Sequence, residues 1–193
     1  DEAIRITIAE FFVPSYRGDL IVTIGDVRIE RASIVALAGS CLSDVQARAL
    51  HTCTTKGYRD FLVQAIDKST KNEVIDAKHI AAVAQLTEDS FDADSLKTMR
   101  EAYQNEEAIA VRFPVTVKPK SGAAIECYFD VRLLCPIELD QPEQAVIRRD
   151  LLIGEEPVGS GKLRQRARGL TLINDGALSK LLLSAEEATH LRW

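Results

Sequence analysis

Between residues 109 and 133, apolar and polar positions alternate almost strictly along the chain. A period of two residues is typical of strands that bury one face, and a polar run from Lys118 to Gly122 interrupts the pattern as a turn would. We therefore predict a long antiparallel hairpin, followed by a third strand over residues 146–153. The alternating apolar positions are Val111, Phe113, Val115 and Val117 before the turn, and Ile125, Cys127, Phe129, Val131 and Leu133 after it.

The N-terminal segment has a helical pattern instead. Apolar residues within residues 2–13 lie on one helical face. Three isoleucines there also alternate as in a strand, but the pair Phe11–Phe12 extends the helical face and favours a helix. We expect Pro14 to end this helix, because proline cannot donate a backbone hydrogen bond. Gly18 is expected to take a left-handed conformation in the turn that follows.

Residues 20–29 alternate on both sides of Gly25 and Asp26, which predicts a short β-hairpin. The next segment, residues 30–41, predicts a short helix, and from residue 43 to residue 105 the pattern is helical, with polar loops such as residues 69–73 between the helices. We expect helices over residues 30–41, 44–51, 56–68, 77–86 (N-cap Asp76) and 92–103 (N-cap Asp92 or Asp94).

The C-terminal part mixes both patterns. We expect a turn-rich loop over residues 155–161, a basic helical turn over residues 162–168, and a buried strand that ends in an Asn-Asp-Gly turn at residues 174–176. Helices then follow over residues 177–184 and 185–193, the second with a capping box formed by Ser184 and Glu187. The fold class is therefore α+β, an antiparallel sheet packed with helices. We divide the chain into residues 1–105, a hairpin with a helical subdomain, and residues 106–193, a sheet subdomain.

Composition narrows the function classes. The chain has 193 residues and a formal net charge of -5, which argues against a general binder of nucleic-acid backbones. No apolar run approaches the roughly 20 residues that span a bilayer, so we expect no membrane association. No signal-peptide pattern occurs at the N-terminus, and the four cysteines form no CxxC pair, so we expect reduced thiols and a cytoplasmic location. The first and last residues suggest a piece of a longer polypeptide.

No complete catalytic motif occurs in the chain. The run GEEPVGSGKLR has Glu156 where a phosphate-binding loop needs glycine and Leu163 where it needs serine or threonine, which excludes that loop. His51, Cys53 and Cys41 lack the paired spacing of zinc ligands, so we predict no metal site. No G-x-S-x-G signature is present. A hydrolase whose site residues come from distant parts of the sequence stays open.

Basic residues are concentrated in a few places. A solvated helix with ion pairs to the many acidic residues would explain them, and so would contact with an anion such as a nucleotide phosphate or nucleic acid. The basic patch comprises Lys162, Arg164, Arg166 and Arg168, and it follows the pair Arg148 and Arg149; Lys118 and Lys120 lie in the predicted hairpin turn.

Three segments resemble parts of a known superfamily. Residues 146–153, VIRRDLLI, resemble the Val-Arg-Arg strand in the middle domain of the ninety-kilodalton heat-shock chaperones. Residues 163–179, LRQRARGLTLINDGALS, resemble the helix, Arg-Gly-Val-Val-Asp strand and Asp-x-Pro-Leu turn that follow it there. Residues 11–26, FFVPSYRGDLIVTIGD, resemble a segment just after the ATPase domain in the GHKL superfamily of gyrase, chaperone, histidine kinase and MutL proteins. Residues 43–105 have no counterpart in the resemblance.

The resemblance implies a chaperone-middle-domain-like or ribosomal-S5-like transducer fold. It also implies a non-catalytic segment of a larger ATP-binding protein, which couples nucleotide state to the conformation of a dimer or partner. The superfamily's Asn and Gly boxes are absent here, so ATP and Mg²⁺ would be held by the parent's ATPase domain. Other implied partners are a second copy of the chain, a protein client or a nucleic acid.

In this superfamily a basic side chain of the middle region reaches the γ-phosphate of ATP. The chaperones use arginine in a Ser-Arg-Glu motif, whereas this chain has Ala185 between Ser184 and Glu186. The remaining phosphate-contact candidates are Arg148, Arg149, Lys118 and Lys120. Two alternatives stay open beside this hypothesis, a stand-alone protein-interaction or scaffold module and the hydrolase with a non-local site.

Overall fold

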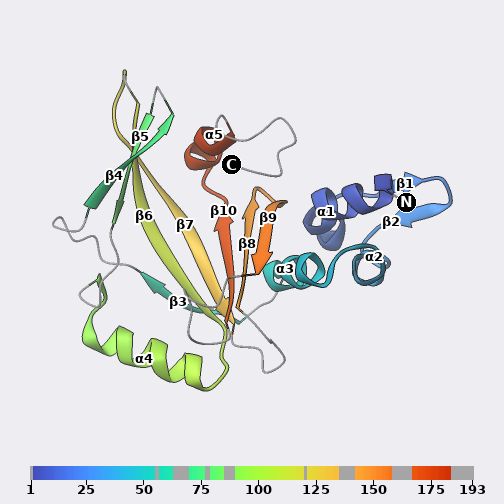
Figure 1. Ribbon diagram of the computed structural model, residues 1–193, viewed down its shortest axis with the longest axis horizontal. Helices are drawn as coiled ribbons and strands as arrows, with labels where there is room; N and C mark the ends of the chain where they lie inside the picture. The colour runs from blue at the N-terminus through green and yellow to red at the C-terminus, as the bar shows by residue number, and fades with distance from the viewer. Residues whose placement is uncertain are drawn as a thin grey trace.

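The computed structural model describes residues 2–54, 57–62, 70–76, 79–84, 90–119, 121–134, 142–157 and 167–183. Helices and strands combine there in the α+β class that the sequence predicted (Figure 1). The helices are α1 (Glu2–Arg17), α2 (Ile34–Cys41), α3 (Asp44–Thr54), α4 (Ala93–Gln104) and α5 (Gly176–Leu183). The strands are β1 (Val22–Ile24), β2 (Val27–Ile29), β3 (Arg59–Leu62), β4 (Thr70–Asp76), β5 (His79–Ala84), β6 (Ile109–Pro119), β7 (Ile125–Leu134), β8 (Glu143–Arg148), β9 (Leu151–Pro157) and β10 (Arg168–Ile173).

A mixed eight-stranded sheet forms the centre of the described structure. Its order is β4-β5-β6-β7-β10-β8-β9, and β3 pairs with the first part of β6. Most neighbours are antiparallel, including the predicted hairpin β6–β7. However, β8 runs parallel to β10 and β3 runs parallel to β6. The sheet is therefore mixed where a purely antiparallel one was expected. The predicted N-terminal hairpin β1–β2 forms a second, two-stranded sheet.

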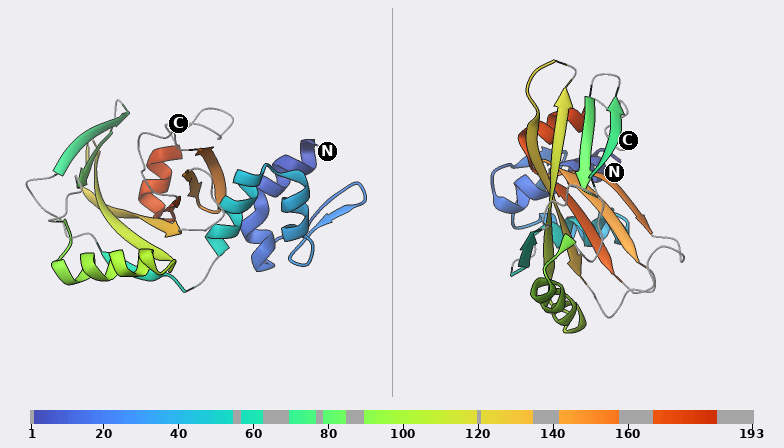
Figure 2. Two further views of the ribbon diagram at one scale, coloured as in Figure 1. Left: turned by 60° about the horizontal axis from the view of Figure 1, so that its bottom comes forward. Right: turned by 90° about the vertical axis from the view of Figure 1, so that its left-hand side faces the viewer.

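The two faces of the large sheet are covered by different helices. The odd-numbered residues of β6 and β7 lie on one face, where α4 packs near the start of β6 and α5 packs near its end. On the opposite face, α1 and α3 cover the strands β8, β9 and β10. Figures 1 and 2 show these N-terminal helices beside β8 and β9, with the β1–β2 hairpin beyond them.

The largest apolar cluster joins the N-terminal helices to this sheet. Its fully buried members come from α1, β2, α2 and α3, and they pack against side chains of β8 and β10. Burying one large aliphatic or aromatic side chain stabilises a fold by about 1.5–3 kcal/mol, so this contact holds both parts together. The side chains are Ile8, Phe12, Ile29, Ile34 and Leu50 on the helical side, and Ala145, Ile147, Leu170 and Leu172 on the sheet.

The first helix does not end at Pro14 as predicted. It continues to Arg17, and the break lies earlier, at Phe11 (φ -116°, ψ 17°). Pro14 therefore falls in the first turn of a second helical segment, where no backbone N–H donor is needed. Gly18 has φ +88° and takes the predicted left-handed conformation.

The helical prediction for residues 43–105 is correct at both ends and wrong in the middle. Helix α3 forms as expected, and Asp92 caps α4 by accepting a hydrogen bond from the Ser95 amide at 2.8 Å. Between them, β3 lies within the predicted helix 56–68, β5 lies within the predicted helix 77–86, and β4 covers residues 70–73 of the predicted loop. Their backbones pair with each other and with β6, and such long-range pairing overrides a weak local helical pattern.

The predicted third strand, residues 146–153, is two strands joined by a turn. Arg148 pairs with Leu151, so Arg149 and Asp150 form a two-residue loop, with φ values of 45° and 70°. Tight hairpin turns require positive φ at both central residues, which Asn and Gly usually supply. This turn contains neither, so the local sequence gave no signal for it. Residues 155–157 belong to β9 and not to the predicted loop.

Two further expectations near the C-terminus need correction. Arg168 is the first residue of β10 and not part of a basic helical turn. The expected Asn-Asp-Gly turn is the start of α5, because the Asp175 carboxylate accepts hydrogen bonds from the amides of Ala177 and Leu178, both at 2.9 Å. The predicted helix 185–193 lies outside the described residues.

The proposed boundary between residues 105 and 106 falls between α4 and β6. Strands on both sides of it pair in one sheet. Among the described residues, no helix has both the length and the apolar character to cross a membrane.

Candidate functional site

Arg148 lies at the end of β8 on the face that α5 covers. It is 4% exposed, and its Nη1 donates a hydrogen bond to Ser179 Oγ at 3.4 Å. This guanidinium therefore belongs to the packing between the sheet and α5. Contact between Arg148 and an external phosphate would require α5 to move.

Arg149 is exposed, and the turn that carries it is held from two sides. On one side, its backbone amide donates to Ile173 O at 3.2 Å and its Nη2 to Gly176 O at 3.4 Å. On the other side, the neighbouring Asp150 forms an ion pair with Arg17, the last residue of α1. The turn thus links α1 to the junction between β10 and α5.

The sheet does not bring Lys118 close to this turn. Leu172 of β10 pairs with Asp130 of β7, which pairs with Arg112 of β6. Lys118 lies six residues farther along β6, about 20 Å at the usual rise per residue of a strand. Lys120 and three members of the predicted basic patch, Lys162, Arg164 and Arg166, lie outside the described residues.

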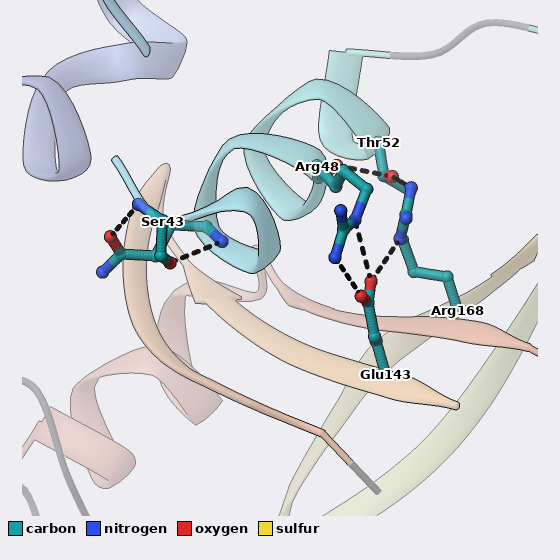
Figure 3. A network of polar contacts seen from close by, with 6 residues as sticks. Ser43, Arg48, Thr52, Glu143 and Arg168 are labelled. Atoms are coloured by element: carbon teal, nitrogen blue, oxygen red, sulfur yellow. Dashed lines mark hydrogen bonds and ion pairs between the residues drawn. The ribbon is translucent and has the colours of Figure 1, made fainter. Parts of the chain in front are cut away.

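Arg168, the described member of that patch, is buried in an ion-pair network (Figure 3). Its Nε lies 3.1 Å from Oε2 of Glu143, the residue directly opposite on β8. Arg48 of α3 reaches the same carboxylate with Nε, at 3.3 Å, and with Nη2. Arg168 is 9% exposed and Glu143 5%. One buried carboxylate is therefore shared by two guanidinium groups.

Side-chain hydrogen bonds hold both ends of helix α3, which carries Arg48 of this network. At its start, Ser43 and Gln46 form a capping box, each side chain bonded to the other's backbone amide at 3.3 Å (Figure 3). At its end, Tyr58 donates to the carbonyl of Thr52 at 3.0 Å and Arg132 to that of Cys53 at 2.8 Å. Such donors satisfy the carbonyls that a helix C-terminus leaves unpaired.

A cavity of about 310 Å³ lies beside the network, between α2, α3 and the start of β10. Its walls include Phe12, Val35, Ala38 and Leu134 together with Arg48 and Arg168. The cavity therefore combines apolar walls with a cationic group, an arrangement found in pockets that bind small molecules.

Two of the described thiols, Cys53 and Cys127, are unsuited to act as nucleophiles. Burial raises the pKa of Cys53 to about 12 and that of Cys127 to about 11, so both are protonated at neutral pH. Cys127 is buried between the sheet and α5, as predicted. Among the described residues, no group of three His, Cys, Asp or Glu side chains could hold a metal ion.

Sequence reasoning missed Arg48 and Glu143, which are 95 residues apart. Ser43 directly before α3 and Gln46 three residues later were a readable helix-start signal. No local pattern connects either residue to Arg168, because Glu143 meets it through the pairing of β8 with β10, and Arg48 joins them when α3 packs on the sheet. Comparison with family models gave no match, and neither did comparison with curated proteins or solved structures.

Proposed function

We propose that this chain is a non-catalytic coupling segment of a larger ATP-binding protein of the GHKL type. In this proposal, Arg149 supplies a positive charge to a phosphate that is bound elsewhere in the parent protein. A fixed positive group beside developing phosphate charge is an established form of electrostatic catalysis. The assignment to this superfamily rests on the sequence resemblance. The choice of Arg149 rests on the position of the turn that carries it.

The observation that carries the proposal is the position of the Arg149–Asp150 turn. Its ion pair to Arg17 connects it to α1, and its bonds to Ile173 and Gly176 connect it to β10 and α5. A displacement of α1 would therefore be transmitted to an exposed arginine. The backbone of this arginine is in a sparsely populated region, and such strain is concentrated at functional sites.

The described residues do not suit a nucleotide pocket of their own. Beside the cavity at the helix–sheet junction, Arg48, Arg168 and Glu143 together carry one net positive charge, too little to balance a triphosphate. This chain's proposed contribution is therefore limited to the placement of Arg149. Of the other phosphate-contact candidates, Arg148 is buried and Lys118 lies along a different part of the sheet.

The test is the ATPase rate of the full-length polypeptide. Arg149→Gly removes the side chain, and glycine tolerates the φ of 45° at this position, so the turn is retained. We expect this change to lower the rate by about 10²-fold, with Arg149→Lys less affected. Arg17→Gln, which removes the ion pair to Asp150 together with the exposed pair to Asp19, should give a smaller loss.

Arg28→Gln is the matched control, because Arg28 forms an exposed pair with Glu30 on the β1–β2 hairpin. An unchanged rate in Arg149→Gly, with an unchanged melting temperature, would contradict the proposal. A parent reading frame without an ATPase domain would also rule it out.

The scaffold alternative has separate support in the face of β6 and β7 opposite α4 and α5. Even-numbered residues there form cross-strand polar pairs: Arg112 bonds Asp130 at 2.8 Å, and Thr116 bonds Glu126 at 3.0 Å. Arg112 also lies over the Tyr128 ring. A partner that binds this face would be lost on Tyr128→Ala while the ATPase rate stays unchanged.

A further inference from the structure

The cavity beside α3 has an unbalanced charge. Arg48 and Arg168 contribute two positive charges and Glu143 one negative charge, which leaves one positive charge beside the cavity. Arg168 is nine-tenths buried, and a buried charge is costly unless an opposite charge and hydrogen-bond acceptors surround it. Glu143 compensates Arg168, so the surplus charge is that of Arg48, whose side chain is 40% exposed; an anion in the cavity would give this charge a partner.

Two guanidinium nitrogens remain available for that anion. The contacts of Arg48 use Nε and Nη2, and those of Arg168 use Nε and Nη1, the latter to Thr52 Oγ1 at 3.5 Å. In the described part of the chain, Nη1 of Arg48 and Nη2 of Arg168 have no hydrogen-bond acceptor. Both residues line the cavity, so both nitrogens belong to side chains at its wall.

The size and the other walls limit the ligand further. A volume of about 310 Å³ is at the lower end of ligand pockets and equals about ten water molecules. The side chains of Phe12, Val35, Ala38 and Leu134 give the cavity an apolar side. A ligand that fits both sides has one anionic end and a short apolar body.

We infer that this cavity is a binding pocket for a small monocarboxylate with an apolar body. A carboxylate matches the single surplus charge and the planar fork of an arginine. Inorganic phosphate carries more negative charge than the single surplus positive charge of the network can balance. This inference goes beyond the proposed coupling function and does not depend on it.

Binding would reinforce the contact between α3 and the sheet. Arg48 belongs to α3 and Arg168 to β10, so a carboxylate held between them adds a bridge across the junction. A ligand that binds only the folded arrangement stabilises it in proportion to its concentration. The stability of the contact between α3 and the sheet would thus depend on the concentration of a small carboxylic acid.

The test is calorimetric titration of the 193-residue chain with hexanoate at pH 7. We expect saturable binding of one hexanoate per chain. Acetate, which lacks the apolar body, and hexan-1-ol, which lacks the charge, should each bind at least tenfold more weakly. Inorganic phosphate should bind more weakly than hexanoate.

The matched variants are Val35→Asp and Val35→Asn. Val35 lines the cavity and is 40% exposed, so neither change should prevent folding. Both side chains have nearly the same shape, and only the aspartate repels a carboxylate. We expect Val35→Asp to weaken hexanoate binding about fivefold to tenfold relative to Val35→Asn.

Four results would overturn the inference: no saturable binding of hexanoate, equal affinity for hexan-1-ol, preference for phosphate, or equal affinities in the two Val35 variants. If Val35→Asp does not fold, Gly39→Asp and Gly39→Asn take its place, because a Cβ at Gly39 meets nothing within 4 Å. Hexanoate binding with an unchanged ATPase rate in Arg149→Gly would support the pocket while contradicting the coupling function.

Discussion

At the scale of single residues, Cys53 illustrates how the junction between helix and sheet controls side-chain chemistry. Its thiol donates a hydrogen bond to the carbonyl of Leu50, with 2.8 Å between Sγ and O. Burial raises its pKa to about 12, and the nearby Arg132 offsets only part of this effect. The protonated thiol is thus the form that the folded state favours.

This shift predicts a dependence of stability on pH. The pKa of an unfolded thiol is about 8.5, so the folded state binds the proton more tightly than the unfolded state does. The stabilisation is complete below about pH 8.5 and is lost as the pH rises toward 12. The free energy of unfolding should therefore fall over this range more steeply in the wild type than in Cys53→Ala.

Urea titrations of both proteins at pH 8 and pH 10 measure this difference. The Cys53→Ala variant should be less stable at both values because it loses packing, but the gap should narrow at pH 10. A gap of constant size would show that the Cys53 thiol does not titrate differently in the two states.

At the scale of elements, two glycines show that the backbone conformation, and not the free space around the residue, decides the effect of a substitution by alanine. A Cβ added at Gly39, within α2, meets no atom within 4 Å, and the same holds for a Cβ at Gly25 in the β1–β2 turn. The two residues differ in backbone, because Gly25 has φ +59° and Gly39 is helical. Alanine should therefore act in opposite directions at the two positions.

We predict that Gly39→Ala stabilises the protein by about 0.5–1 kcal/mol, since alanine is the better helix former. Gly25→Ala should destabilise it by about 1 kcal/mol, because a Cβ disfavours the left-handed conformation. Thermal or urea unfolding measures both changes. Stabilisation by alanine at both positions would contradict the assigned turn conformation.

At the scale of the whole molecule, the N-terminal helices and the sheet are joined by apolar packing and by the Arg48–Glu143–Arg168 network. The network is the polar part of an otherwise apolar contact. Removal of one member of a buried ion-pair network leaves the other charges without compensation, which costs about 3–5 kcal/mol.

We therefore predict that Glu143→Gln, which preserves volume and removes the charge, lowers the free energy of unfolding by about 3 kcal/mol or more. Asp130→Asn is the control, because the Arg112–Asp130 pair is more exposed and such pairs contribute about 1 kcal/mol or less. Urea unfolding compares the two. Equal losses would show that the network does not hold the parts together.

Much of the fold could be predicted because it depends on local patterns. Alternation identified β6 and β7 and the β1–β2 hairpin, while helical spacing identified α1 to α5. The strands β3 and β5 were missed because their state depends on pairing with β6, which begins 25 residues after β5 ends, and β4 was missed because it pairs with β5. The Arg149–Asp150 turn was missed because it lacks the glycine or asparagine that usually marks such turns.

The candidate site was less predictable than the fold. The sequence by itself determined the α+β class, the main hairpin and the presence of basic residues in the C-terminal half. Only the tertiary structure decided that Arg148 packs against α5, that Arg149 occupies a turn tied to α1, and that Arg168 shares a carboxylate with Arg48. The physical reason is the separation along the sequence. Hydrophobic periodicity is a pattern of neighbouring residues within one helix or strand, whereas charge pairing depends on which distant segments the packed core brings together.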